Sequence, residues 1–259
     1  MNTYTQTFEA DTGKILNIVI NSLYSDRDIF LRELLSNASD AIQKRKFLGQ
    51  TDQSLLNNEA DSIEIIINTK KKTIEIVDTG IGLTENELAE TLGTIAKSGT
   101  SAFLQEMEGE ENSKDAAKTL IGQFGVGFYS AFMVADKVEV LSRKAGTKQV
   151  SSWESDGQSG FSIDKSDEKQ AVGTKIKLFL KKDAKEFAAP DKIKTLIKKY
   201  SDHISFPINI KEADGEIEQV NSATAIWTKS ASQISKEEYK DFYNSTFGTF
   251  DEPFATLPV

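Results

Sequence analysis

Residues 26–42 read DRDIFLRELLSNASDAI, and this stretch predicts a helix whose two faces carry opposite chemistry. A helix turns by about 100° per residue, which places Asn37 and Asp40 within about 40° of Glu33 on one face. The apolar residues gather on the opposite face: Leu31, Leu34, Leu35, Ala38 and Ile42. A carboxylate can act as a general base, and an amide oxygen can bind a hard cation. The polar face is therefore a candidate site, and the alternative is an ordinary solvated face.

The rest of the chain predicts an α+β fold, a two-layer α/β sandwich in which helices cover a mainly antiparallel sheet. Residues 62–68 (SIEIIIN) and 73–80 (TIEIVDTG) are rich in β-branched residues and flank a lysine turn, which indicates an antiparallel hairpin. Further strands are expected over residues 3–10, 136–144, 150–155, 160–166, 173–181 and 206–210. Further helices are expected over residues 13–25, 84–96, 128–135 and 190–204.

A polar segment late in the chain predicts a domain boundary. Residues 211–226 (KEADGEIEQVNSATAI) have the composition of a linker. We therefore expect residues 1–210 to form one domain. A new helical pattern follows, with little sequence after it, so we expect residues 227–259 to be the truncated start of a second domain.

Composition excludes several classes of protein. The 259 residues carry a net charge of −9, which argues against nucleic acid as the main partner. There is no cysteine and a single histidine, His203, so disulfides, thiol catalysis, Cys- or His-ligated metal sites and Ser-His-Asp catalysis are excluded. The sequence shows neither a signal-peptide pattern nor an apolar run of membrane-spanning length. We expect a cytoplasmic location and no membrane partner.

Two glycine-containing motifs suggest a ligand site. In DTGIG (78–82), Asp78 ends a predicted strand and is followed by Gly80 and Gly82, so its carboxylate could accept a hydrogen bond from a planar base that approaches closely. The alternative is an ordinary Asp-Thr-Gly turn. In IGQFGVGFYSAF (121–132), three glycines lead into a predicted helix whose free N–H groups could bind phosphate. Their spacing matches neither a Rossmann fingerprint nor a P-loop.

A lid is also predicted. LGTIAKSGT (92–100) contains Lys97 and a flexible Ser-Gly-Thr sequence, and it precedes the polar, acidic residues 105–118. Glycine-bearing segments lie on both sides of this polar stretch, which is typical of a segment that closes over a ligand.

Taken together, these motifs resemble those of the GHKL ATPases, which share the Bergerat fold, and most closely the bacterial type of the heat-shock protein 90 chaperone family. The resemblance rests on YSDRDIFLRELLSNASDA, DTGIGLT, LGTIAKSGT, IGQFGVGFYSAFMVA and GTKIKLFLK, and it covers essentially the whole chain. The sequence WTK…EEYKDFY is similar to the start of that family's middle domain.

The resemblance implies a role for each matching residue. Glu33 would be the catalytic general base, Asn37 would bind Mg²⁺ at the phosphates of ATP or ADP, and Asp78 would accept the adenine amine. Asp40 and Thr174 would support the adenine pocket, which further residues would line: Asn37, Ala41, Gly82 and Leu92. Residues 94–127 would form the lid, and the phosphates would be held by Lys97, Gly122, Gln123, Phe124, Gly125, Val126, Gly127 and Phe128. The stretch before Leu92 departs from the family pattern, which puts a pocket contact at Thr91 in doubt.

The implied function is that of an ATP-dependent molecular chaperone of the stress response. Its N-terminal domain would hydrolyse Mg-ATP to ADP and phosphate, and lid closure would drive the folding of unfolded or partly folded client proteins. The full-length protein would be a homodimer. A family arginine that contacts the γ-phosphate lies beyond this chain, so we expect good binding but weak hydrolysis by residues 1–259. The alternatives are another GHKL ATPase or a nucleotide-binding interaction module without turnover.

Overall fold

The computed structural model describes residues 18, 26–57, 60–95, 99–106, 120, 122, 125–158, 160–212, 215, 217–223, 234–247 and 251–255. The strand predicted over residues 3–10 lies outside this part of the chain. So do most of the helix predicted over 13–25 and most of the acidic segment 105–118.

An eight-stranded sheet forms one layer of the fold, with the strand order β5-β4-β3-β6-β2-β1-β7-β8. All neighbouring strands pair antiparallel except β1 and β7, which run parallel. The strands are β1 (Ile63–Asn68), β2 (Thr73–Asp78), β3 (Ala135–Arg143), β4 (Val150–Ser155), β5 (Phe161–Ser166), β6 (Gly173–Leu180), β7 (Ile208–Glu212) and β8 (Ile217–Gln219). The predicted hairpin and the predicted α+β class are confirmed.

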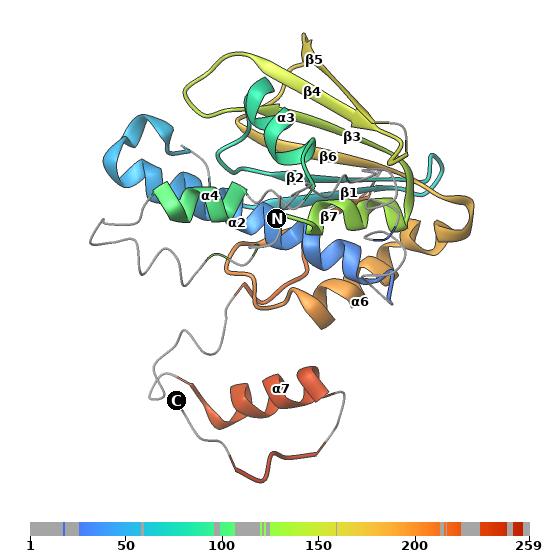
Figure 1. Ribbon diagram of the computed structural model, residues 1–259. Coiled ribbons are helices and arrows are strands. Elements are labelled where there is room, and N and C mark those ends of the chain that lie inside the picture. The colour runs from blue at the N-terminus through green and yellow to red at the C-terminus, as the bar shows by residue number, and fades with distance from the viewer. Residues whose placement is uncertain are drawn as a thin grey trace, which may run out of the picture.

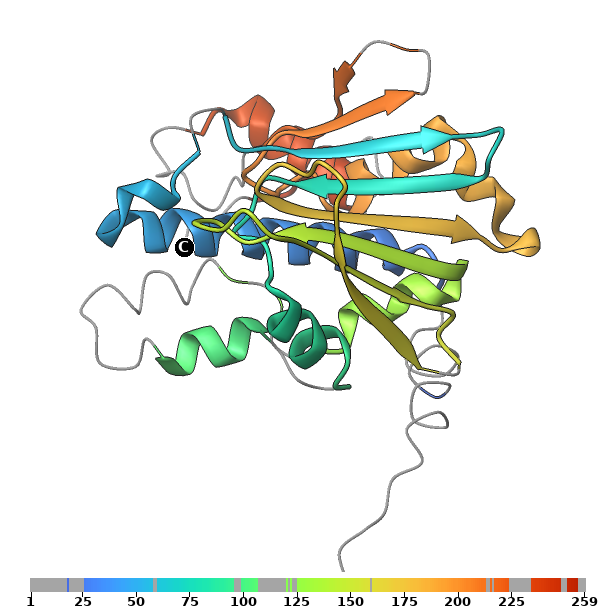
Figure 2. The ribbon, with the colours of Figure 1, turned by 90° about the horizontal axis from the view of Figure 1, so that it is seen from above.

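Helices form the second layer. The long helix α2 (Ile29–Thr51) and α6 (Pro190–Tyr200) lie along one face of the sheet, as Figures 1 and 2 show from two directions. The other α-helices are α3 (Glu85–Leu92), α4 (Gly99–Glu106) and α7 (Lys236–Phe247). The described residues also form three 3₁₀ segments: η2 (Gln53–Leu55), η3 (Gly127–Met133) and η4 (Lys182–Ala188).

The core lies between these two layers. The predicted apolar face of α2 is buried, and it packs with the inward-facing isoleucines of β1 and β2 and with the apolar side of α6. The buried residues on these elements include Leu31, Leu34, Leu35, Ala38, Ile42, Ile63, Ile65, Ile67, Ile74, Ile76, Ile193, Leu196 and Ile197. Strand β1 alternates buried and half-buried residues, as expected for a sheet covered on one face.

Three local predictions were wrong. The helix expected over residues 128–135 is the 3₁₀ segment η3, and Gly99 and Thr100, expected within a flexible Ser-Gly-Thr sequence, form the start of α4. Part of the linker predicted over residues 211–226 also belongs to the sheet, since β7 continues to Glu212 and β8 pairs with it. All three residues of this edge strand are exposed, and two of them, Glu218 and Gln219, are polar, so its sequence resembles that of a linker. No helix in the described ranges combines the length and apolarity that crossing a bilayer requires.

Candidate functional site

The polar face of α2 meets the glycine-rich segment that precedes and opens η3. A Cβ atom added at Gly127 would lie 2.5 Å from Oε2 of Glu33. A Cβ atom added at Gly122 would lie 3.2 Å both from Oδ1 of Asn37 and from Oδ2 of Asp40. The structure therefore brings two of the predicted glycines against the three predicted polar residues of α2, and larger side chains at these glycines would fill the space between the two segments.

Glu33 is held in place by its neighbour along the helix. Arg32 donates from Nε at 3.1 Å and from Nη2 at 2.5 Å to Oε1 of Glu33. The Glu33 side chain is 22% exposed, so water can reach a carboxylate that is otherwise enclosed. The other oxygen, Oε2, faces Gly127. Sequence reasoning missed Arg32, because adjacent residues on a helix point about 100° apart and do not normally pair.

Asp40 joins two segments that are far apart in the sequence. Its Oδ2 accepts hydrogen bonds from the N–H of Gly122 at 2.8 Å and from the hydroxyl of Thr100, near the start of α4, at 3.1 Å. Asp40 is 5% exposed, so these bonds satisfy a buried carboxylate. The contact with Thr100 was not predicted, since nothing in the local sequence links α4 to α2.

Asp78 is a buried acid at the end of β2, with 5% exposure. Its Oδ1 accepts from the N–H of Gly80 at 2.8 Å and from the N–H of Thr174 at 3.3 Å. Burial raises the pKa of Asp78 to about 7, although these two bonds and the charge of Arg45 act in the opposite direction. Both hydrogen bonds that the described residues make to the carboxylate end on Oδ1, so Oδ2 can accept from a ligand.

The backbone beside Asp78 leaves no room for side chains. A Cβ atom at Gly80 would lie 2.6 Å from Cβ of Ala41, and one at Gly82 would lie 2.0 Å from the carbonyl oxygen of Arg143. Gly82 also has a φ of +68°, which favours glycine. The carbonyl of Ala41 accepts from the N–H of Ile81 at 3.0 Å, so the DTGIG segment is bonded directly to α2. Ala41 therefore lies close to the backbone of Gly80, two residues after Asp78, whereas Gly82 packs against Arg143.

Replacing Gly80 with alanine should destabilise the fold by about 1–3 kcal/mol, because the new methyl group would overlap the backbone of α2. The added Cβ would lie 2.7 Å from the carbonyl carbon of Ala41 and 2.7 Å from Oδ1 of Asp78. Urea unfolding measures the effect. The control is Gly99→Ala, where the nearest atom would be Cγ2 of Thr91 at an ordinary 3.5 Å. Equal stability of the two variants would contradict this tight packing.

A buried hydroxyl pair supports Asp78 from the sheet. The hydroxyls of Ser142 and Thr174 lie 2.9 Å apart, and Ser142 also accepts from the N–H of Leu83 at 2.8 Å. Ser142 is 0% exposed and Thr174 is 8% exposed. Thr174 was predicted, whereas Ser142 was missed. The available signal was the alternation along β3, where Val138, Val140 and Ser142 share one buried face.

Of the remaining predicted residues, four are described by the structure and three are not. Leu92 lies at the end of α3, and its carbonyl accepts from the hydroxyl of Tyr129 at 2.9 Å. Phe128 is 7% exposed, and the centroid of its ring lies 5.4 Å from that of Trp153, so its side chain belongs to the core. Gly125 has a φ of +65° and Val126 packs on the core. Lys97, Gln123 and Phe124 lie outside the described residues.

One further buried residue borders the site and was missed from sequence. Arg45, on α2, is 4% exposed and donates to the carbonyl oxygens of Leu55 at 2.5 Å and Thr79 at 2.9 Å. Its charge lies close enough to Asp78 to influence the pKa of that carboxyl. Arg45 thus connects Thr79, the residue that follows Asp78, to α2.

Comparison with known proteins agrees with this geometry. Residues 27–178 match the family described as histidine kinase-, DNA gyrase B-, and HSP90-like ATPase, and residues 209–258 match the family described as Hsp90 protein. The chain is 45% identical over 258 residues to the chaperone protein HtpG of Rhodospirillum rubrum, covering 99% of this chain and 41% of that protein. It is 47% identical to the HtpG proteins of Roseobacter denitrificans and Rickettsia typhi, covering 98% and 96% of this chain and 40% of each relative.

The chain thus spans about two fifths of the length of these relatives, with 41% and 40% of their residues matched. The first family match begins two residues before α2 and ends in β6, so it contains that helix, the DTGIG segment, the glycine-rich segment and Thr174. The chain is similar over nearly its whole length to proteins named HtpG, and it belongs to the family of histidine kinase-, DNA gyrase B- and HSP90-like ATPases.

Proposed function

We propose that this chain binds Mg-ATP and hydrolyses it to ADP and phosphate, as the nucleotide-binding part of an ATP-dependent chaperone. The observation that carries the proposal is the carboxylate of Asp78. It is buried, and both of its hydrogen bonds from the described residues end on Oδ1. An acceptor so placed suits the exocyclic amine of adenine, because Oδ2 is left to accept its hydrogen bond.

The phosphates would extend from this pocket toward the polar face of α2. Asn37 and the backbone near Gly122 lie close together there, since a Cβ atom at Gly122 would be 3.2 Å from Oδ1 of Asn37. The first N–H groups of η3, which have no carbonyl partner within the helix itself, would bind phosphate oxygens. By family resemblance, Lys97, Gln123 and Phe124 would add to this group, and residues 94–127 would close over it as a lid.

A magnesium ion fits these residues only together with the nucleotide. Among the described residues, no group of three His, Cys, Asp or Glu side chains could hold a metal ion. Mg²⁺ commonly takes one protein oxygen together with phosphate oxygens and water, and the amide oxygen of Asn37 would supply that ligand. The metal would neutralise charge on the phosphates.

Glu33 would carry out the proton transfer. Its Oε2 faces the glycine-rich segment, while Oε1 is bonded to Arg32, so one oxygen is available to accept a proton from an attacking water. The water oxygen would bond to the γ-phosphorus as the bond to the ADP oxygen breaks. Arg32 would hold Glu33 in position through its two hydrogen bonds to Oε1.

Other features of the whole protein are proposed from its relatives. They are action on unfolded or partly folded client proteins, a homodimer, a cytoplasmic location, and a second domain beginning within residues 227–259. The match of residues 209–258 to the Hsp90 protein family supports the last of these.

Magnesium dependence tests the proposed phosphate site. Titration calorimetry with ADP should give tighter binding to wild type in excess Mg²⁺ than in a chelator. Asn37→Ala should lose about tenfold in affinity in Mg²⁺ and little in the chelator, because one charge-assisted contact is removed. Asn209→Ala, on β7, is the matched control. Full magnesium dependence in Asn37→Ala would exclude this residue as a ligand, and no ADP binding by wild type would refute the proposed function.

A further inference from the structure

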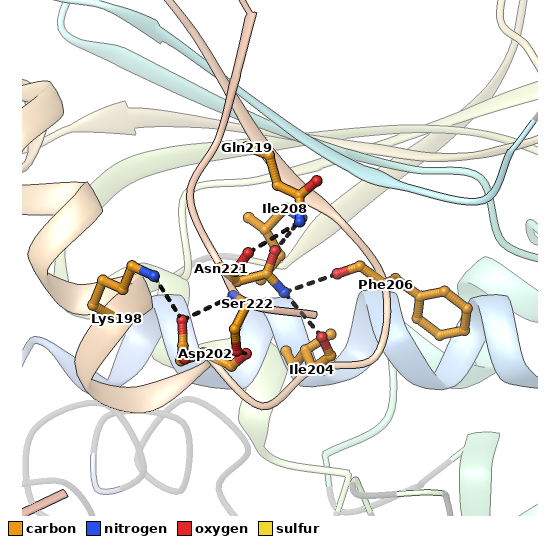
Figure 3. Close-up of polar contacts among 8 residues, drawn as sticks. All are labelled: Lys198, Asp202, Ile204, Phe206, Ile208, Gln219, Asn221 and Ser222. Carbon is orange, nitrogen blue, oxygen red and sulfur yellow. Dashed lines mark hydrogen bonds and ion pairs between the residues drawn. The ribbon is translucent and has the colours of Figure 1, made fainter. Parts of the chain in front are cut away.

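Asn221 fastens the segment after β8 to the turn that leads into β7 (Figure 3). It is 4% exposed, and its Nδ2 donates to the carbonyl oxygens of Ile204 and Phe206, both at 2.9 Å. Its Oδ1 accepts from the N–H of Ile208 at 2.7 Å. Each donor and the acceptor of this amide thus has a backbone partner, and each of those backbone groups would lose that partner if the amide were removed.

Ser222 makes a second set of bonds to Asp202, in the turn after α6 (Figure 3). Its N–H donates to Oδ1 of Asp202 at 3.0 Å, and its hydroxyl lies 2.8 Å from Oδ2 and 3.0 Å from the carbonyl oxygen of Asp202. Lys198 also donates to Oδ1 of Asp202, at 3.1 Å. Burial acts to raise the pKa of Asp202, but the bonds from Ser222 and Lys198 outweigh it and lower the pKa.

The residue directly after these bonds has an unusual backbone conformation. Ala223 has a φ of +52°, in the left-handed region that residues other than glycine rarely adopt. Before it, Val220 donates from its N–H to the carbonyl oxygen of Ile208 at 2.9 Å and is 6% exposed. The segment held by these bonds, residues 217–222, therefore ends at Ser222; we call it the fastened segment.

Helix α6 also contacts the start of α2, the helix that carries Glu33. Nζ of Lys192 lies 2.9 Å from Oδ1 of Asp28, the residue just before α2. The side chain of Asp28 is 18% exposed, so this ion pair is shielded better than an ordinary surface pair. One helix thus touches both the proposed catalytic helix and the fastened segment.

We propose that Asn221, Ser222 and Asp202 form an exit clamp, which makes residues 217–222 a fixed part of the nucleotide-binding domain and places the pivot toward the rest of the protein at Ala223. Displacement of the chain beyond Ala223 would then act on α6, and through Lys192 and Asp28 on α2, instead of being absorbed by a loose linker. The exit clamp does not depend on nucleotide binding.

Hydrogen exchange of the 259-residue chain tests the exit clamp. We compare wild type with Asn221→Ala, Ser222→Ala and the control Lys194→Ala, which removes only an exposed ion pair between α6 and β8. In Asn221→Ala the amides of residues 217–222 and of Ile208 should exchange roughly tenfold faster or more. Amides of β2 and β6 should not change. Ser222→Ala should give a smaller increase confined to residues 220–222, and Lys194→Ala should give none.

Two results would overturn the proposal. The first is exchange of residues 217–222 in wild type as fast as in an unfolded chain. The second is faster exchange throughout the sheet in both clamp variants, which would make Asn221 and Ser222 general supports of the core. Ser222→Ala keeps the test decisive if Asn221→Ala does not fold, because it leaves every buried backbone bond of Asn221 in place. ADP affinity should stay within about twofold of wild type in Ser222→Ala, which separates this test from that of the nucleotide site.

Discussion

Asp78→Asn should weaken ADP binding by roughly 100-fold. The asparagine keeps the shape of the side chain, and its oxygen can still accept from the N–H groups of Gly80 and Thr174. Its NH₂ group then takes the position of Oδ2, where the adenine amine is expected, so two donors would face each other. Calorimetric titration with Mg-ADP measures the loss.

The control for this variant is Asp61→Asn. Asp61 lies near the same segment and accepts from the hydroxyl of Thr79 at 3.4 Å, but it is outside the proposed pocket. This control should bind ADP as wild type does. If Asp78→Asn also bound ADP with unchanged affinity, Asp78 would not be the adenine acceptor, and the observation that carries the proposed function would fail.

The same substitution should stabilise the ligand-free fold at alkaline pH. Burial raises the pKa of Asp78 to about 7 in the folded state, above a value of about 3.9 in the unfolded state. Between these values the folded state binds more protons, so the contribution of Asp78 to stability is present below about pH 4 and is lost as the pH rises through about 7. Asp78→Asn should therefore exceed wild type in free energy of unfolding at pH 8 by up to about 4 kcal/mol, and by less at pH 5.

Urea unfolding at pH 5, 6.5 and 8 measures this difference. A constant difference between wild type and Asp78→Asn at all three pH values would show that the carboxyl of Asp78 does not titrate in this range. If Asp78→Asn loses ADP affinity and gains free energy of unfolding, Asp78 serves binding although its buried carboxylate lowers the stability of the fold.

Glu33→Gln should lower single-turnover ATP hydrolysis by about 10²- to 10⁴-fold, the usual contribution of a positioned general base. The affinity for Mg-ADP should change little, because the amide has the same shape and can still accept one bond from Arg32. Phosphate release measures the rate, and titration measures the affinity.

Glu85→Gln is the matched control for Glu33→Gln, since it removes an exposed carboxylate from the first turn of α3. It should hydrolyse ATP at the wild-type rate. Equal rates for Glu33→Gln and wild type would exclude Glu33 as the base, whereas a parallel loss of ADP affinity would assign Glu33 to binding and not to proton transfer.

Sequence patterns predicted the elements that have strong periodicity. The apolar positions of α2 recur at helical spacing, and those of β1 and β2 are β-branched and lie between turn residues, so these elements follow from local sequence. Strand β8 was missed because three exposed residues carry no alternation. The segment after Gly127 was expected to be an α-helix but is the 3₁₀ segment η3. It is only seven residues long, and in so short a segment tertiary packing decides the helix type.

The candidate site was predictable where residue type and spacing agreed. Glu33, Asn37 and Asp40 lie on one helical face, and Asp78 ends a strand before two glycines. Ser142 and Thr100 were missed because their contacts with Thr174 and Asp40 join residues 32 and 60 positions apart. Such contacts depend on how the layers pack, which a single sequence does not encode locally.

The parallel pairing of β1 with β7 has a consequence for synthesis on the ribosome. Residues 63–68 lie early in the chain, and the neighbour that covers one side of them is residues 208–212. A nascent chain that has formed the first hairpin therefore presents a row of unpaired N–H and C=O groups until translation has passed Glu212. Pairings over such sequence distances form slowly. The growing polypeptide thus exposes an adhesive strand edge from the time the hairpin forms until residue 212 has been added, and during that period it is open to aggregation.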